Sequence, residues 1–158
     1  MIETGALLLF DGTCGFCARS VQFVLQREHR RRTLRFASLD SGIGREVRAQ
    51  YPELDGVDSV VWIEADSGQK DYRLYVRSEA VFRVLKYLGG PWTAVAVAGA
   101  VVPRPIRDWV YDFVARHRHK IIPREAESCL LPSPEQRSRF IDWGTEPATL
   151  PREISASR

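Results

Sequence analysis

The 158-residue chain has the size of one globular domain with room for an extension, and its 44% apolar and 27% charged residues are ordinary for such proteins. A formal net charge of +3, from 23 basic and 20 acidic residues, is too balanced to indicate nucleic-acid binding, so we expect no nucleic-acid partner. The longest apolar stretch, residues 93–102, is about half as long as a membrane-spanning helix, and no secretory signal is visible. We therefore expect a soluble, cytoplasmic protein without a membrane span.

Strands and helices are indicated in turn along the first 90 residues. Short apolar or β-branched runs between turn residues predict buried strands, and apolar residues at helical spacing after a capping residue predict amphipathic helices. The first expected elements are a strand at Ala6–Phe10, a helix from about Cys14 to Arg27 and a strand at Leu34–Leu39. A helix capped by Asp40-Ser41 and ended by Pro52 follows. A hairpin of Ser59–Glu64 and Tyr72–Val76 comes next, and then a helix that is capped by Ser78 with Glu79 and ends at Gly89-Gly90.

This order predicts an α/β fold with a mixed sheet flanked by helices, and it is the element order of the thioredoxin fold. Beyond Gly90 the sequence turns helical, with an apolar segment at 92–102, a break at Pro103 and Pro105, and then a helix with one apolar face. We expect these helices either to close over the sheet or to form a groove facing a protein. The predicted parts are a thioredoxin-like core at residues 1–90, a helical extension packed on it at 91–120, and a partly ordered tail at 121–158.

Cys14 and Cys17 form a C-x-x-C motif where the first predicted strand gives way to a helix. Unpaired N–H groups and the positive dipole end at a helix N-terminus favour the thiolate, which is the nucleophile of disulfide exchange. One helical turn later, Cys17 lies on the same side and within bridging reach. We therefore predict that Cys14, expected to be the more exposed cysteine, is the nucleophile and that Cys17 resolves the mixed disulfide. This redox-active disulfide needs no further cofactor.

Asp11 precedes the motif by three residues and has two interpretations. Its carboxylate is either a proton acceptor, or a group that orients the loop or a water near the resolving thiol. Alternatively, it belongs to an ordinary Asp-Gly turn and accepts hydrogen bonds from nearby backbone N–H groups. Thr13 is a candidate cap of the following helix.

Zinc binding is the main alternative use of a C-x-x-C pair, and it requires two more ligands. The imidazole and thiol candidates form no second pair at zinc-site spacing, so we expect no metal. Cys129 is expected to be an inert thiol, and the alternatives are a redox partner of the pair or a regulatory site. The candidates weighed for zinc are His29, His117, His119 and Cys129.

The run LLFDGTCGFC at residues 8–17 resembles the DCC family of thiol–disulfide oxidoreductases, which is named for an Asp and two cysteines in a D-G-x-C-x-x-C motif. The likeness continues at residues 77–80, 88–90 and 103–115, and covers about residues 6–120. The resemblance implies a thioredoxin-like fold and a protein-disulfide reductase or oxidase activity. The residues that match the motif are Asp11, Cys14 and Cys17.

The implied partners are a protein or small-molecule disulfide or thiol and an electron donor that the sequence does not identify. The chain departs from ordinary thioredoxins in two places: no tryptophan precedes Cys14, and no proline precedes the strand at residue 59, where Asp58 or Ser59 would take its place. Two rival functions stay open. One is a redox-sensing interaction module without turnover, whose helices at 92–119 bind a partner, and the other is a zinc-binding domain.

Overall fold

The computed structural model describes residues 6–28, 33–54, 56, 60–65, 72–121 and 134–141. At its centre is a four-stranded sheet with the order β2-β1-β3-β4. β1 runs parallel to β2 and antiparallel to β3, and β3 and β4 form an antiparallel hairpin. The strands are β1 (Ala6–Phe10), β2 (Arg35–Ser38), β3 (Val61–Ala65) and β4 (Tyr72–Val76).

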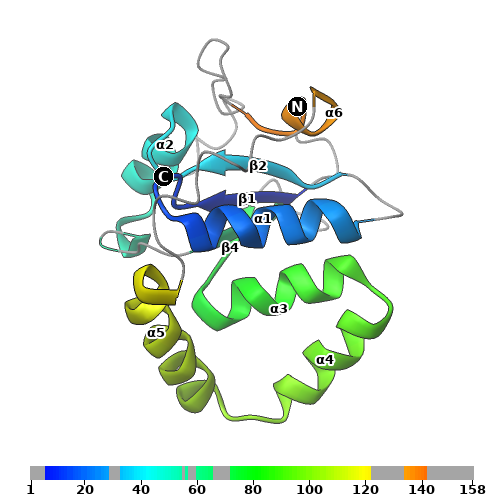
Figure 1. Cartoon of the computed structure of the whole chain (residues 1–158). Coiled ribbons are helices and arrows are strands. Elements are labelled where there is room, and N and C mark those ends of the chain that lie inside the picture. The colour runs from blue at the N-terminus through cyan, green and yellow to red at the C-terminus, as the bar shows by residue number, and fades with distance from the viewer. Residues whose placement is uncertain are drawn as a thin grey trace.

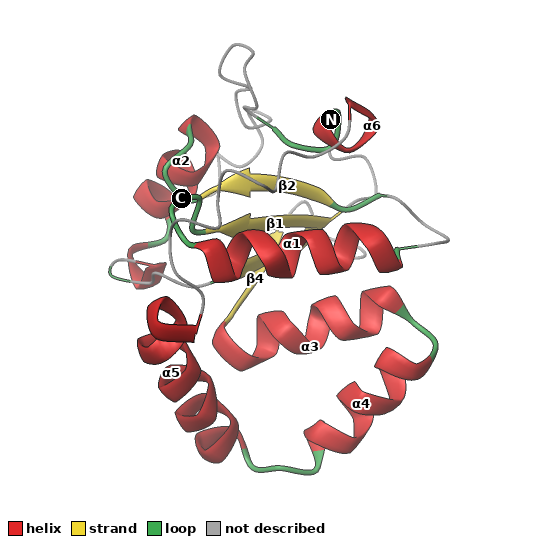
Figure 2. Ribbon diagram, in the orientation of Figure 1, coloured by secondary structure: helices red, strands yellow, loops and turns green. Residues whose placement is uncertain are grey.

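Helices cover both faces of this sheet (Figures 1 and 2). α1 and α3 lie over one face and α2 over the other, which gives the mixed sheet flanked by helices that a thioredoxin-like fold requires. The predicted fold class is therefore confirmed. The helices are α1 (Gly15–Arg27), α2 (Gly42–Gln50), the short 3₁₀ helix η1 (Pro52–Leu54), α3 (Arg77–Leu88), α4 (Pro91–Ala100), α5 (Arg104–Ile121) and α6 (Pro134–Arg137).

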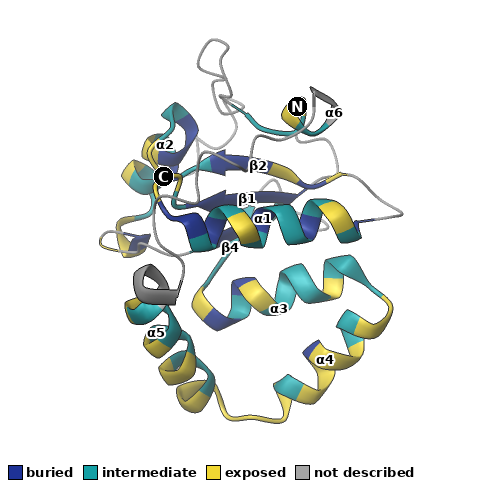
Figure 3. Ribbon diagram, in the orientation of Figure 1, coloured by how far each residue is buried: buried dark blue, intermediate teal, exposed yellow. Residues whose placement is uncertain are grey.

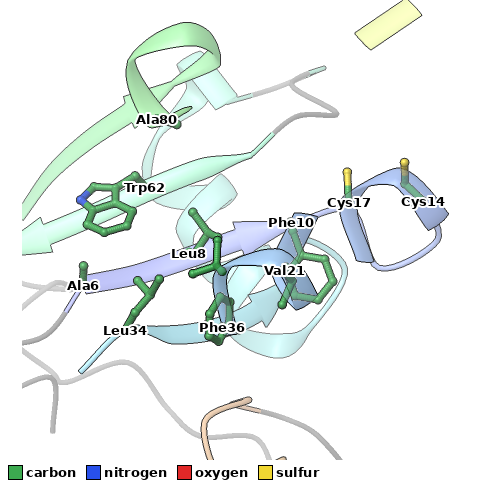
Figure 4. Packing of buried hydrophobic residues seen from close by; sticks show 11 residues of the cluster. Ala6, Leu8, Phe10, Cys14, Cys17, Val21, Leu34, Phe36, Trp62 and Ala80 are labelled. Carbon is green, nitrogen blue, oxygen red and sulfur yellow. The ribbon is translucent and has the colours of Figure 1, made fainter. Parts of the chain in front are cut away.

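Every residue of the central strand β1 is buried, and successive side chains enter opposite halves of the core. Leu8 and Phe10 face α1 and α3, in the cluster drawn in Figure 4, whereas Leu7 and Leu9 face α2. The continuous apolar run that predicted this strand is explained by burial of its side chains on both faces of the sheet. A strand held from both sides fixes the place of the loop that follows it.

The start of α3 differs from the prediction. The expected Ser78 cap is wrong, because Val76 occupies the N-cap position and no side chain caps the helix. Arg77 has a φ of 54°, so the chain turns from β4 directly into α3 and carries Ser78 past the capping position. The Ser78 hydroxyl instead donates a hydrogen bond to Asp108, which joins α3 to α5. By contrast, Ser41 caps α2 as predicted, by accepting a hydrogen bond of 3.1 Å from the Gly44 N–H.

α4 contacts α3, and α5 contacts both α3 and α1. The connection between α4 and α5 lies away from the sheet (Figure 1). The predicted apolar face of α5 does not close over the sheet, because much of it stays exposed, as does most of α4 (Figure 3). The alternative, a groove facing a protein, stays a prediction. No described helix is long and apolar enough to cross a membrane. The exposed members of that face are Ile106, Trp109, Val110 and Phe113.

The described part of the tail, residues 134–141, lies along the edge of β2. The Phe36 N–H donates to the Arg139 carbonyl at 3.0 Å, and the Ile141 N–H donates to the Phe36 carbonyl at 2.8 Å. The Phe140 ring stacks on the Phe36 ring with 5.3 Å between centroids. Residues 139–141 therefore add a single bridge pair at the β2 edge of the sheet.

Candidate functional site

The loop from β1 to α1 carries the predicted motif, and its shape depends on close contact with β2. The Cys14 N–H donates to the Asp11 carbonyl at 3.2 Å, which closes the turn and places Cys14 at the N-cap of α1. A side chain on Gly12 would put its Cβ 2.7 Å from the Ser38 hydroxyl. A side chain at position 12 would therefore crowd Ser38, which shows that the motif loop packs closely against the end of β2.

Asp11 organises this loop. One carboxylate oxygen, Oδ1, accepts hydrogen bonds from the Thr13 N–H at 2.9 Å and from the Thr13 hydroxyl at 2.8 Å. This geometry is that of an aspartate turn, the second interpretation of Asp11. The prediction that Thr13 caps α1 is wrong, because its hydroxyl is committed to Asp11 and α1 has no side-chain cap.

Both motif cysteines are thiols, and both are buried. Cys14 is 1% exposed and Cys17 is 3% exposed, so the expectation that Cys14 is the more exposed one is wrong. Figure 4 shows the two sulfur atoms pointing to the same side of the start of α1. What distinguishes Cys14 is its N-cap position on a 13-residue helix, where the unpaired backbone N–H groups and the positive end of the dipole lie.

A pocket of about 420 Å³ lies beside the motif, between α1, α3 and α5, and Cys17 forms part of its wall. Cys14 does not line it. Sequence reasoning missed this pocket because its walls come from β1, α1, α3, α5 and the residue before β3, and most wall residues by themselves look like ordinary core residues. The signal in the sequence is the set of apolar positions on α3 and α5, which includes the wall residues Val81, Leu85 and Val114.

Within the described ranges, no group of three or more histidine, cysteine or acidic side chains could hold a metal ion. His117 lies on α5, where its Nδ1 is 2.8 Å from the Phe113 carbonyl and its ring packs on the Phe113 ring. The remaining residues on which predictions were made lie outside the described residues. These are His29, Asp58, Ser59, Cys129 and the side chain of His119.

Comparison with known proteins agrees with the resemblance read from the motif. Residues 8–124 match the family model of DCC1-like thiol–disulfide oxidoreductases. The chain is 38% identical over 137 residues to the uncharacterized protein YuxK of Bacillus subtilis (strain 168), a match covering 85% of this chain and 93% of that protein. It is 35% identical over 127 residues to a DCC family protein of Arabidopsis thaliana, named as chloroplastic, covering 79% of this chain and 69% of that protein. No solved structure matches.

Proposed function

Because the chain belongs to the DCC1-like thiol–disulfide oxidoreductase family, we propose that it exchanges a dithiol for a disulfide through Cys14 and Cys17. The observation that carries this proposal is the placement of the C-x-x-C pair at the start of α1, with both sulfur atoms on one side. The substrate is a protein or small-molecule disulfide or thiol. The exchange needs no prosthetic group, since the two sulfur atoms hold the two electrons that are transferred.

The N-cap position supports Cys14 as the attacking thiolate. Backbone N–H groups at a helix start stabilise nearby negative charge, and the thiolate is the reactive form of cysteine. Cys14 attacks one sulfur of the substrate disulfide, forms a mixed disulfide and releases the other substrate sulfur as a thiolate. Cys17 then attacks the Cys14 sulfur, releases the second substrate thiol and leaves a Cys14–Cys17 disulfide. Two electrons pass to the substrate, the two thiol protons pass to the leaving groups, and the reverse sequence oxidises a dithiol.

Burial of both sulfur atoms restricts access to the pair. A thiol that is 1% or 3% exposed meets a large partner only when the surrounding residues open locally or are displaced by the substrate. This restriction supports a slow but selective exchange, because only partners able to open the site reach the thiolate. We propose that the protein acts in the cytoplasm. Because that compartment is reducing, the two cysteines would be in the dithiol form there between reactions.

Thiol trapping and a turnover assay test the proposal in a Cys129→Ser background, which removes the third cysteine. The parent should form a reversible Cys14–Cys17 disulfide in a dithiothreitol redox titration and accelerate insulin reduction by dithiothreitol. Cys14→Ser should reduce insulin only at the uncatalysed rate while keeping its circular dichroism spectrum. Cys17→Ser should accumulate stable mixed disulfides. Turnover by Cys14→Ser near that of the parent, or no internal disulfide in the titration, would reject the proposed roles.

The exposed apolar residues of α5 favour a second candidate, a redox-sensing module that binds a protein without turnover. Trp109 is 63% exposed and Phe113 is 48% exposed, and apolar surface of this kind marks interaction sites. The double variant Cys14→Ser/Cys17→Ser separates the candidates. If the protein is a binding module, the double variant should still bind its partner. If it is an enzyme, the double variant should lose its activity, and no partner should depend on the exposed residues of α5.

A further inference from the structure

The pocket between α1, α3 and α5 has the size and the wall chemistry of a small-molecule site. Its volume of about 420 Å³ lies in the range of roughly 300–1,000 Å³ that is usual for such sites. Most of its wall is apolar, so a ligand that enters it removes apolar surface from water. Apolar wall residues include Phe16 and Val21 of α1, Val81 and Leu85 of α3, and Val114 of α5.

The uncharged polar side chains of the wall offer little to a polar ligand. The Ser20 hydroxyl donates to the Phe16 carbonyl at 2.9 Å, and Tyr111 already makes an interaction of its own. A polar group that entered the interior would lose its hydrogen bonds to water and regain few of them. The interior therefore selects a hydrocarbon chain or ring.

The charge at the opening of the pocket is positive. Arg19 and Val81 are the exposed wall residues, whereas the others are buried or half-buried, so these two border the opening to solvent. Among the described residues that line the pocket, Arg19 carries a formal charge and none is acidic. An anion at the opening thus meets a guanidinium, which binds carboxylates well, without an opposing carboxylate in the wall.

We propose that this pocket binds an amphipathic monocarboxylate, such as a medium-chain fatty acid, with its chain between the three helices and its carboxylate at Arg19. The apolar wall matches the chain, and the single cation at the opening matches the head group. The inference goes beyond the proposed function, because this binding requires no exchange of thiols. Cys17 forms part of the wall, so the bound chain lies beside the helix that carries the motif.

Calorimetric titration of the full chain, kept reduced, tests the ligand class. The affinity should rise about tenfold from octanoate to decanoate, because two more methylene groups are buried. Decyltrimethylammonium has the same chain with the opposite charge, and it should bind at least about tenfold more weakly than decanoate. Absence of decanoate binding, or equal affinity for the anion and the cation, would overturn the inference.

Substitution of the cation tests the contribution of Arg19. Arg19→Gln should lower the affinity for decanoate by at least about threefold, the size expected for an exposed charged pair, and should leave the affinity for decanol unchanged. Arg45, an exposed arginine of α2 that does not line the pocket, provides the matched control. Arg45→Gln should bind decanoate like the parent, and an equal loss in both variants would reject Arg19 as the head-group site.

A large side chain at the opening tests where the chain of the ligand lies. Val81 lines the pocket and is 39% exposed, so Val81→Trp should fold and yet lower the affinity for decanoate by about tenfold or more, because the indole takes up the ligand's space. Val95 of α4 is 53% exposed and does not line the pocket, so Val95→Trp is the control and should bind like the parent.

Methyl NMR spectra of the parent locate the ligand without any substitution. Decanoate should shift the methyl signals of Leu85 and Val114, which line the pocket, and leave those of Val95 unchanged. Shifts confined to the exposed valines of α4 would place the chain on the outer surface and overturn the inference. Insulin reduction by the same preparation reports on the proposed function separately, so a failure of one is distinguishable from a failure of the other.

Discussion

At the scale of single residues, the two cysteines have different surroundings even though both are buried. Cys14 is placed by the turn that Asp11 closes and by its position at the start of α1. Cys17 forms part of the wall of an apolar pocket. The side chain of Asp11 is the link between the turn and the motif, since its hydrogen bonds to Thr13 fix the backbone directly before Cys14.

Two substitutions of Asp11 distinguish loop ordering from proton transfer. Asparagine keeps an oxygen that accepts from the Thr13 N–H and hydroxyl but cannot act as a proton acceptor at neutral pH. If Asp11 orders the loop, Asp11→Asn should keep the exchange rate within about threefold of the parent, while Asp11→Ala, which leaves the turn unsupported, should lower it by about tenfold or more. Stopped-flow oxidation of the pair measures both rates. An equal, large loss in the two variants would identify a proton-transfer role instead.

At the scale of elements, the motif depends on how α2 is seated against the end of β2. The Ser41 cap fixes the first turn of α2, and its hydroxyl also donates to the Ser38 carbonyl at 2.6 Å. A Cβ on Gly44 would lie 2.4 Å from the carbonyl oxygens of Ser38 and Leu39. The absence of a side chain at Gly44 thus lets α2 rest on the strand that also supports Gly12 of the motif loop.

Replacing Gly44 by alanine should destabilise the protein even though alanine is the better helix former. The intrinsic gain is about 1 kcal/mol, whereas forcing a Cβ against two fixed carbonyl groups costs about 1–3 kcal/mol or more. We expect a net loss of free energy of unfolding in urea denaturation. Ala49→Gly, at an exposed position of the same helix, is the control that measures the propensity term alone. A more stable Gly44→Ala protein would show that α2 moves without cost.

At the scale of the whole molecule, one buried carboxylate joins four parts of the chain. Glu28 directly follows α1, and its side chain is 2% exposed. It accepts a hydrogen bond from the Tyr87 hydroxyl of α3, and it pairs with Arg139 at 2.5 Å. The Tyr87 oxygen also accepts from the Leu34 N–H at 3.0 Å, at the start of β2. Residues 134–141 are thereby tied to the far end of the helix that carries the cysteines.

Arg139→Met should lower the free energy of unfolding by about 3–5 kcal/mol, because it leaves the Glu28 carboxylate buried without its cation. The double variant Glu28→Gln/Arg139→Met should recover part of that loss, since the remaining amide carries no charge. Guanidinium denaturation followed by circular dichroism measures both. Glu28 lies about 20 Å from the start of α1, from the rise per residue of a helix, so the folded variants should keep the exchange rate of the parent.

The sequence by itself was sufficient to predict the order of strands and helices, the position of the C-x-x-C pair at a helix start, the Ser41 cap and the family. These features depend on apolar periodicity, turn residues and short motifs, which act over a few neighbouring residues. Helix and strand ends differ from the prediction by one or two residues. The Ser78 cap failed because the chain turns at Arg77 and the Ser78 hydroxyl bonds Asp108 of α5.

Only the tertiary structure decided the burial of both cysteines, the apolar pocket at Cys17 and the Glu28–Arg139 pair. Each of these brings together side chains that are far apart in the chain, as in the pocket, where α1, α3 and α5 meet. Local sequence patterns do not reveal these long-range contacts, because an apolar residue that lines a pocket cannot be told from one that fills the core. The strand–helix frame follows from local physics, whereas access to the sulfur atoms follows from packing between distant segments.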